Sequence, residues 1–174
     1  PRWGVATAFP RGMNTAELGA LVIDRLVARH QSIAVAESLT GGMLVAELIR
    51  TPGASAVVRG GIVAYATELK HSLLGVDAGV LAAHGAVHPD VAAQMAAGVR
   101  DRLAVAGEPA FIGISTTGVA GPDPQDGHAV GTVYLGFAVG TEVLTKQLHL
   151  SGSREDIRSA VVYESLNELV AMLD

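Results

Sequence analysis

The chain has 174 residues and a formal net charge of −5, and 49% of its residues are apolar while only 17% are charged. This length favours one domain, and the apolar content excludes an intrinsically disordered chain. The absence of cysteine excludes disulfides, a Cys-ligated zinc site and a thiol nucleophile. No apolar run approaches the roughly 18 residues of a membrane span. The basic residues are scattered, which argues against a nucleic-acid partner. We therefore expect a cytoplasmic protein without a secretory signal.

The hydrophobic pattern predicts helices that alternate with short strands. In chain order the predicted elements are helix 14–29, strand 32–36, helix 40–50, strand 57–66, helices 67–74 and 89–106, strands 110–115, 132–139 and 142–150, and helix 153–170. Residues 1–13 are expected to form an irregular lead-in, and residues 14–174 to form one domain.

Local signals define several of these helix starts. Asn14 with Glu17 has the spacing of an N-terminal capping box, and so does the pair at Ser153 and Asp156. Thr67 is the expected cap of the short helix that follows it.

The order of the elements predicts the fold class. Short apolar strands that alternate with helices indicate a sheet covered on both faces. The late hairpin around Gly140-Thr141 makes that sheet mixed, and Gly60-Gly61 marks a bulge or bend. We expect an α/β fold, a three-layer α/β/α sandwich with a mixed, mostly parallel sheet. Because the chain has three Phe, three Tyr and one Trp, its core must rely on closely packed aliphatic side chains.

The strongest candidate site is the segment Ala36-Glu37-Ser38-Leu39-Thr40-Gly41-Gly42, between a predicted strand and a predicted helix. Ligands of open α/β sheets bind at the carboxyl ends of strands. The backbone N–H groups of Thr40, Gly41 and Gly42 are expected to hold a phosphate or a developing oxyanion. Ser38 is the candidate nucleophile. In the alternative interpretation, Ser38 or Thr40 only caps the helix.

A serine nucleophile needs a base, and Lys70 is the candidate. Only Lys70 and Lys146 are lysines in a chain with twelve Lys and Arg residues, and a desolvated lysine can be neutral near pH 7. Tyr65 lies five residues before Lys70, so its hydroxyl is expected in the same pocket as a proton relay or hydrogen-bond partner. The alternative is that Lys70 is a solvated helix residue.

A second glycine-rich segment, residues 115–123, follows a predicted strand. Thr117 offers a hydroxyl, while Gly118 and Gly121 expose backbone amides that suit a phosphate or carboxylate. The loop that continues to residue 131 is long, and such loops are often functional. The alternative is an ordinary surface loop.

Two weaker signals remain. His84, His88 and Asp90 are metal ligands by type, but the glycine after His84 and the missing third donor argue against a closed site, so no metal is expected. Arg154 and Arg158 open the last helix, where the helix dipole disfavours cations. A ligand anion or an acidic partner would explain them, and a solvated pair is the alternative.

Six motifs together resemble one known family. They are Ala36-Glu37-Ser38-Leu39-Thr40-Gly41-Gly42, Tyr65 with Lys70, Leu73-Leu74-Gly75-Val76, His84-Gly85-Ala86-Val87, Thr117-Gly118-Val119-Ala120-Gly121-Pro122 and Gly152-Ser153-Arg154. In this order they are similar to the CinA carboxy-terminal domain family, over roughly residues 15–172. The amino-terminal domain of full-length CinA proteins is missing, so a stand-alone version is expected.

The resemblance implies a nicotinamide-nucleotide amidase. Such an enzyme hydrolyses the carboxamide of nicotinamide mononucleotide to nicotinic acid mononucleotide and ammonia, without cofactor or metal. Ser38 falls on the family's nucleophile, Lys70 on its general base and Tyr65 on the assisting tyrosine. Thr117 and Arg154 fall on positions of the substrate pocket. Family members tend to be dimers, so a homodimer is expected.

The sequence departs from the family pattern at a few positions. Leu39 is bulkier than the usual residue, His88 replaces a common Ser, and residues 124–129 lack the second Gly of a Gly-Gly pair and a Lys-Pro. These departures leave two alternatives open. One is a non-catalytic nucleotide-binding or regulatory module that uses both glycine-rich segments as anion cradles, and the other is that both segments are only structural.

Overall fold

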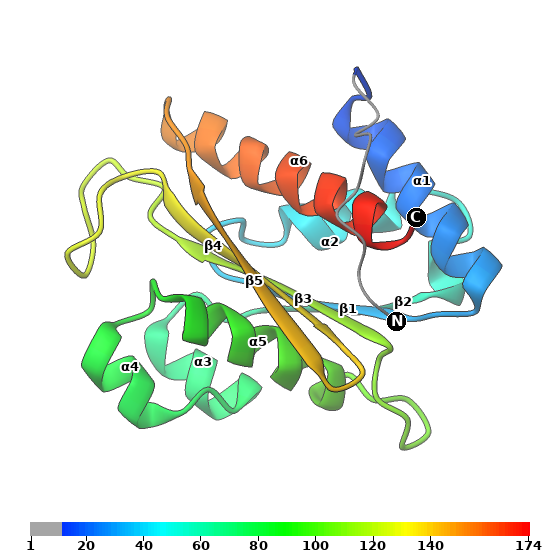
Figure 1. Ribbon diagram of the computed structural model, residues 1–174, viewed down its shortest axis with the longest axis horizontal. Helices are drawn as coiled ribbons and strands as arrows, with labels where there is room; N and C mark the ends of the chain where they lie inside the picture. The colour runs from blue at the N-terminus through cyan, green and yellow to red at the C-terminus, as the bar shows by residue number, and fades with distance from the viewer. Residues whose placement is uncertain (1–11) are drawn as a thin grey trace.

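The computed structural model describes residues 12–174, which form a sheet between two helical layers (Figure 1). Helices α1 (Thr15–Arg29), α2 (Met43–Ile49) and α6 (Arg154–Met172) lie on one face. Helices α3 (Thr67–Leu74), α4 (Ala78–His84) and α5 (Pro89–Arg102) lie on the other. The expected three-layer α/β/α sandwich is confirmed. The predicted lead-in lies outside the described residues except for its last two positions.

The sheet has five strands in the order β2-β1-β3-β4-β5. The strands are β1 (Ile33–Glu37), β2 (Val58–Val63), β3 (Ile112–Gly118), β4 (Thr132–Val139) and β5 (Glu142–His149). β1 pairs in parallel with β2 and β3, whereas β4 is antiparallel to both β3 and β5. The sheet is therefore mixed, as expected, and β4 runs against the other four strands.

Close backbone packing replaces aromatic side chains on the α5 face of the sheet. A Cβ added at Gly113 would lie 1.9 Å from the Ala96 carbonyl oxygen, and one added at Gly136 would lie 2.2 Å from that of Ala92. Helix α5 therefore lies directly on β3 and β4, because these two glycines leave room for its backbone. Core packing of this kind was expected from the aromatic-poor composition.

Several local predictions are confirmed. Both capping boxes form, with Asn14 at the start of α1 and Ser153 at the start of α6. The β1–β2 register shifts so that Ile33 pairs with Val58 and Ala34 with Gly60. This shift is the irregularity predicted at Gly60-Gly61.

Other local predictions were wrong. Thr67 is the first residue of α3 and Ala66 occupies the cap position without a side-chain hydrogen bond. Helix α2 begins at Met43 instead of residue 40. The sequence did not predict the 3-10 helix η1 (Ala54–Ala56) or α4. Helix α4 contains no fully buried residue, and only Val80 and Leu81 pack against the core. Its clearest signal in the sequence is the Asp77 cap. Within residues 12–174, no helix combines the length and apolarity that crossing a bilayer requires.

Candidate active site

The end of strand β1 places two neighbouring side chains on opposite faces of the sheet. Ile33 and Val35 pack in the core beneath α1, α2 and α6, whereas Ala34 and Ala36 pack with residues of α3 and α5. Side chains alternate along a strand, so Glu37 meets α2 while Ser38 meets α3. The Ser38 N–H group donates to the Thr116 carbonyl at 3.0 Å, which holds the residue against β3.

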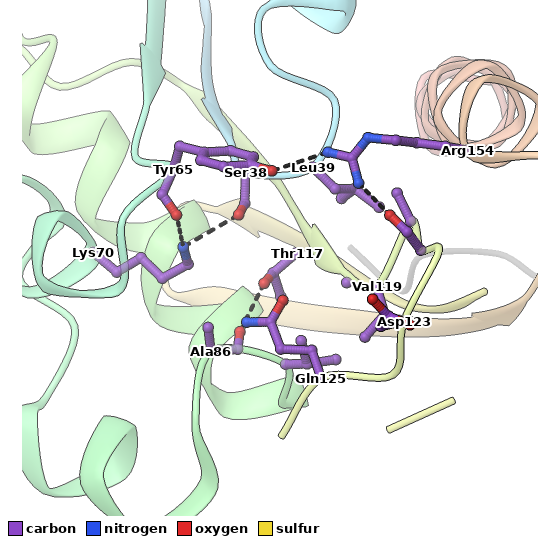
Figure 2. Close-up of a pocket in the computed structure, with 14 residues that line it drawn as sticks. Ser38, Leu39, Tyr65, Lys70, Ala86, Thr117, Val119, Asp123, Gln125 and Arg154 are labelled. Carbon is purple, nitrogen blue, oxygen red and sulfur yellow. Dashed lines mark hydrogen bonds between the residues drawn. The ribbon is translucent and has the colours of Figure 1, made fainter. Parts of the chain in front are cut away.

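Ser38 and Lys70 meet in a buried pocket, as the sequence predicted (Figure 2). The Lys70 side chain is fully buried, and its Nζ lies 3.2 Å from Ser38 Oγ. The same nitrogen donates to the carbonyls of Ala64 at 2.8 Å and Tyr65 at 3.4 Å. In the neutral amine, two hydrogens directed at these carbonyls leave the lone pair for the Ser38 hydroxyl proton. The interpretation of Lys70 as a solvated helix residue is therefore wrong.

Burial also changes the acidity of this lysine. Loss of solvation lowers the pKa of Lys70 from 10.5 to about 8, while the negative charges of Asp126 and Glu68 partly oppose that shift by raising it. At pH 7 roughly a tenth of the amine is then neutral, compared with a negligible fraction for a solvated lysine. A side chain with this pKa can accept a proton from serine near neutral pH.

The cavity in front of Ser38 and Lys70 has a volume of about 150 Å³. We call it the Ser–Lys pocket. Its lining residues come from the β1–α2 turn, the β2–α3 connection, α3, the α4–α5 turn, the end of β3 with the loop after it, and α6: Ser38, Leu39, Tyr65, Lys70, Ala86, Val87, Thr117, Gly118, Val119, Ala120, Gly121, Asp123, Gln125 and Arg154. The two segments predicted from sequence thus contribute to one cavity.

Thr40, Gly41 and Gly42 do not line the Ser–Lys pocket. The Gly41 N–H donates to the Ser38 carbonyl at 3.1 Å, and the Gly42 N–H donates to the Glu37 carboxylate at 2.9 Å. The Thr40 hydroxyl lies 2.8 Å from that of Thr116 in the interior. The predicted anion cradle is therefore wrong for Gly41 and Gly42, because their amides already have acceptors within the protein.

Glu37 is the functional residue that sequence reasoning missed. Its fully buried carboxylate accepts hydrogen bonds from the N–H groups of Gly42, Leu44 and Val45, at 2.9, 3.1 and 2.8 Å. These are the unpaired donors of the first turn of α2. Glu37, not Ser38 or Thr40, thus satisfies this helix end. The signal was available, since a glutamate at the end of an apolar strand must be paired if it is buried.

Tyr65 contributes two different groups to the site. Its backbone carbonyl faces Lys70, while its hydroxyl accepts a hydrogen bond from Arg154 at 2.9 Å (Figure 2). Arg154 also donates to the carbonyl of Gly121. The hydroxyl is thus a hydrogen-bond partner of Arg154, and together they connect α6 to the loop after β3 at the mouth of the pocket.

The floor of the pocket is formed by Thr117 and Ala86. The buried Thr117 hydroxyl donates to the Ala86 carbonyl at 2.7 Å, so towards a ligand it can only accept. The Ala86 N–H donates to Asp126 at 3.1 Å. Asp126 lies at the tip of the β3–β4 loop (residues 119–131), where Gln125 and His128 exchange two backbone hydrogen bonds. The alternative interpretation as an ordinary surface loop is therefore wrong, because this loop forms a wall of the pocket.

The remaining sequence signals have structural explanations. Arg158 donates to the backbone carbonyls of Leu39 and Thr40, which neither of its two predicted interpretations anticipated. His88 caps α5 by accepting the Asp90 N–H at 3.2 Å, and its ring stacks on His84 with centroids 4.2 Å apart. No group of three or more metal-ligating side chains occurs among residues 12–174.

Comparison with known proteins identifies a matching family and a similar protein. The family model described as the CinA C-terminal domain matches residues 15–173. A CinA-like protein of Frankia casuarinae is 50% identical over 156 residues, which cover 90% of this chain and 35% of that protein. The chain therefore spans about a third of the length of this curated relative.

Solved structures of similar length share the fold. The crystal structure of a competence-damaged protein (CinA) superfamily protein from Enterobacter cloacae matches with a TM-score of 0.88 at 31% identity, over 96% of each chain. That of the competence damage-inducible protein A from Klebsiella pneumoniae matches with a TM-score of 0.84 at 35% identity, over 91% of this chain and 96% of the other. This chain belongs to the CinA C-terminal domain family.

Proposed function

We propose that the protein is an amidohydrolase that converts nicotinamide mononucleotide to nicotinic acid mononucleotide and ammonia. The observation that carries this proposal is the contact of 3.2 Å between a fully buried lysine amine and the Ser38 hydroxyl. A serine beside a neutral base is an activated nucleophile. The choice of a pyridine nucleotide among amides comes from the family resemblance.

The first half of the reaction forms an acyl-enzyme. Lys70 takes the hydroxyl proton of Ser38 as Oγ attacks the amide carbon, so a C–O bond forms and the carbonyl π electrons move to oxygen. When this oxyanion collapses, the C–N bond breaks and the Lys70 ammonium gives its proton to the leaving nitrogen. Ammonia departs, and the amine of Lys70 is neutral again.

The second half releases the acid. Lys70 removes a proton from water, the hydroxide attacks the ester carbon, and the C–Oγ bond breaks. The proton returns from Lys70 to Ser38, which leaves a carboxylic acid that ionises at neutral pH. The same base thus serves both halves without any metal or cofactor.

One backbone group and one side-chain group support these steps. The N–H group of Leu39, next to the nucleophile, has no acceptor within residues 12–174, so we assign it to the oxyanion. We assign the Thr117 oxygen to the amide nitrogen, because that oxygen can only accept and an amide NH₂ donates.

The size of the Ser–Lys pocket limits what enters it. Its volume of about 150 Å³ is below the roughly 300–1,000 Å³ of pockets that enclose whole drug-sized ligands. The carboxamide and its ring therefore occupy the pocket, while the ribose phosphate stays at the mouth. Arg154 supplies a positive charge there, on the side formed with Tyr65.

Ammonia release from purified protein tests the proposal. The substrates are nicotinamide mononucleotide, nicotinamide riboside and nicotinamide, without added metal, and the acid product is identified by chromatography. We expect the mononucleotide to be the best substrate and both Ser38→Ala and Lys70→Ala to abolish turnover. Undiminished turnover by Ser38→Ala would contradict the nucleophile.

A calorimetric titration separates the proposal from a non-catalytic nucleotide-binding module. Binding of the mononucleotide without ammonia release would favour that module. The hydrogen bonds of Gly41 and Gly42 count against it, since one of its two anion cradles is occupied by the protein's own acceptors.

A further inference from the structure

The backbone turn that carries Ser38 is held from its carbonyl side by one distant side chain. Arg158 of α6 donates from Nε to the Leu39 carbonyl at 3.0 Å and from Nη2 to the Thr40 carbonyl at 3.2 Å. The guanidinium also lies close to Gly41, where a Cβ would be 3.5 Å from Nη2. Arg158 and this turn are 118 residues apart in the sequence, so only the fold brings them together.

These two hydrogen bonds fix two consecutive peptide planes. In a trans peptide the carbonyl and the following N–H point in opposite directions. Holding the Leu39 carbonyl therefore directs the Thr40 N–H away from Arg158. In the same way, holding the Thr40 carbonyl directs the Gly41 N–H away from Arg158. The Gly41 N–H in turn donates to the Ser38 carbonyl. The orientation set by Arg158 is thus passed to the nucleophile's own backbone.

Glu37 and Arg158 act on complementary groups of the same turn. Glu37 accepts from N–H groups on the α2 side, and Arg158 donates to carbonyls on the α6 side. The fork of a guanidinium suits two neighbouring carbonyls, which a lysine ammonium would match less well.

The position of Arg158 is unfavourable for its own helix. It is the fifth residue of α6, just beyond the first turn, near the helix end where the dipole disfavours a cation. Glu155 offsets this with an ion pair at 2.9 Å, but its side chain is 67% exposed, and such pairs contribute little. The contacts with the Ser38 turn are therefore the better explanation for an arginine at this position.

We propose that Arg158 is a positioning residue for the nucleophile: it orients the Leu39–Thr40–Gly41 backbone so that Ser38 Oγ faces Lys70. This inference rests on the proposed function only where it is tested by turnover, and not where it is tested by hydrogen exchange. Arg158 does not line the Ser–Lys pocket, so its effect on the reaction passes through the backbone.

The test compares Arg158→Met and Arg158→Lys with two matched controls. Glu155→Gln removes the ion pair but keeps both carbonyl contacts, and Arg50→Gln removes a similar exposed pair with Glu47 on α2. For Arg158→Met we expect kcat to fall about 100-fold, the loss typical of a small displacement of reacting groups, with KM within threefold. Arg158→Lys should recover part of the lost turnover rate, and both controls should stay within twofold of the wild type.

Hydrogen exchange of the amides of residues 39–42 gives a second readout that needs no catalysis. Exchange at Gly41 should be faster in Arg158→Met than in the wild type and unchanged in Glu155→Gln. If the wild type releases no ammonia, the proposed function fails while exchange still tests Arg158. If Arg158→Met folds and shows the same turnover rate and the same exchange rate at Gly41 as the wild type, the inference is overturned. If that variant does not fold, the same two results in Arg158→Lys would overturn it.

Discussion

Glu37 and Ser38 are consecutive residues, yet the carboxylate of one binds the first turn of α2 while the hydroxyl of the other contacts Lys70 of α3. One residue anchors the strand end to one helical layer, and the next directs its hydroxyl to the opposite layer. The position of Ser38 therefore depends on an anion that does not itself enter the pocket.

Replacing Glu37 should lower the stability of the protein. In Glu37→Gln the side chain loses its charge and one acceptor oxygen, so part of the three-donor set of Gly42, Leu44 and Val45 is unsatisfied in the interior. We expect the free energy of unfolding in urea to fall by about 2–3 kcal/mol. Glu17→Gln, in the exposed capping box of α1, is the control and should cost about 1 kcal/mol or less. Equal losses in the two variants would contradict the anchoring role.

The pH dependence of turnover should report Lys70. Only the neutral amine accepts the Ser38 proton, and burial lowers the pKa of Lys70 to about 8. The quantity kcat/KM should therefore rise about tenfold per pH unit below pH 8 and level off above it. Ammonia release between pH 6 and pH 10 measures this limb. A profile that falls across the same range would contradict a neutral lysine base, and Lys70→Arg should be inactive at every pH.

Removing a negative charge near Lys70 should move the rising limb of the pH profile of kcat/KM. Asp126 raises the pKa of Lys70 by its charge, so Asp126→Asn should lower this pKa and shift the acid limb to lower pH. The amide oxygen can still accept the Ala86 N–H, which keeps the loop in place. Asp24→Asn on α1, in the opposite helical layer, removes the same charge and should leave the profile unchanged. An identical shift in both variants would exclude a local effect.

Burial of Lys70 should also appear in the pH dependence of stability. Its pKa is 10.5 in an unfolded chain and about 8 in the fold, so between these values the unfolded state binds a proton that the folded state does not. Stability due to this group must then rise with pH across that window, by about 3 kcal/mol. Unfolding in urea measures this rise: the free energy of unfolding of the wild type minus that of Lys70→Met should be higher at pH 10.5 than at pH 7 by this amount. A lower value of that quantity at pH 10.5 would refute the assignment.

Tyr65→Phe separates two roles of the tyrosine. The hydroxyl binds Arg154 at the mouth, while the contact with Lys70 comes from the backbone. We expect KM for the mononucleotide to rise several-fold, while the turnover rate changes less than threefold. A much slower turnover, by about 100-fold, at unchanged KM would instead indicate a proton relay through the hydroxyl.

Much of the fold was predictable because it depends on local patterns. Apolar runs identified all five strands, and paired polar residues identified the starts of α1 and α6. Ser38 and Lys70 were predicted together because a serine nucleophile needs a base and a desolvated lysine can be neutral near pH 7. In the fold each follows a strand of the same sheet, and β1 and β2 are parallel neighbours. The ends of both strands therefore lie at one edge.

The rest of the site was not predictable because it depends on backbone directions. No sequence pattern shows that the Gly42 N–H points at Glu37, or that two carbonyls of the Ser38 turn point at α6. Glycines at a helix start suggest an open anion site, yet here a carboxylate from the end of the preceding strand fills it. Helix α4 was missed because it has no fully buried residue, and only Val80 and Leu81 pack against the core.

The antiparallel pairing of β3 with β4 has a consequence for how this pocket can change. The β3–β4 loop leaves and re-enters paired strands, with Val119 and Thr132 hydrogen-bonded at its base. Lengthening such a connection costs little closure entropy, only about 0.6 kcal/mol per doubling. Ser38 and Lys70, the proposed nucleophile and base, lie outside this loop, after β1 and on α3, although Asp126 of the loop acts on Lys70 through its charge. Insertions that keep Asp126 in place can therefore reshape this wall of the pocket without moving Ser38 or Lys70, so the ligand preference can change while the environment of the proposed base is kept.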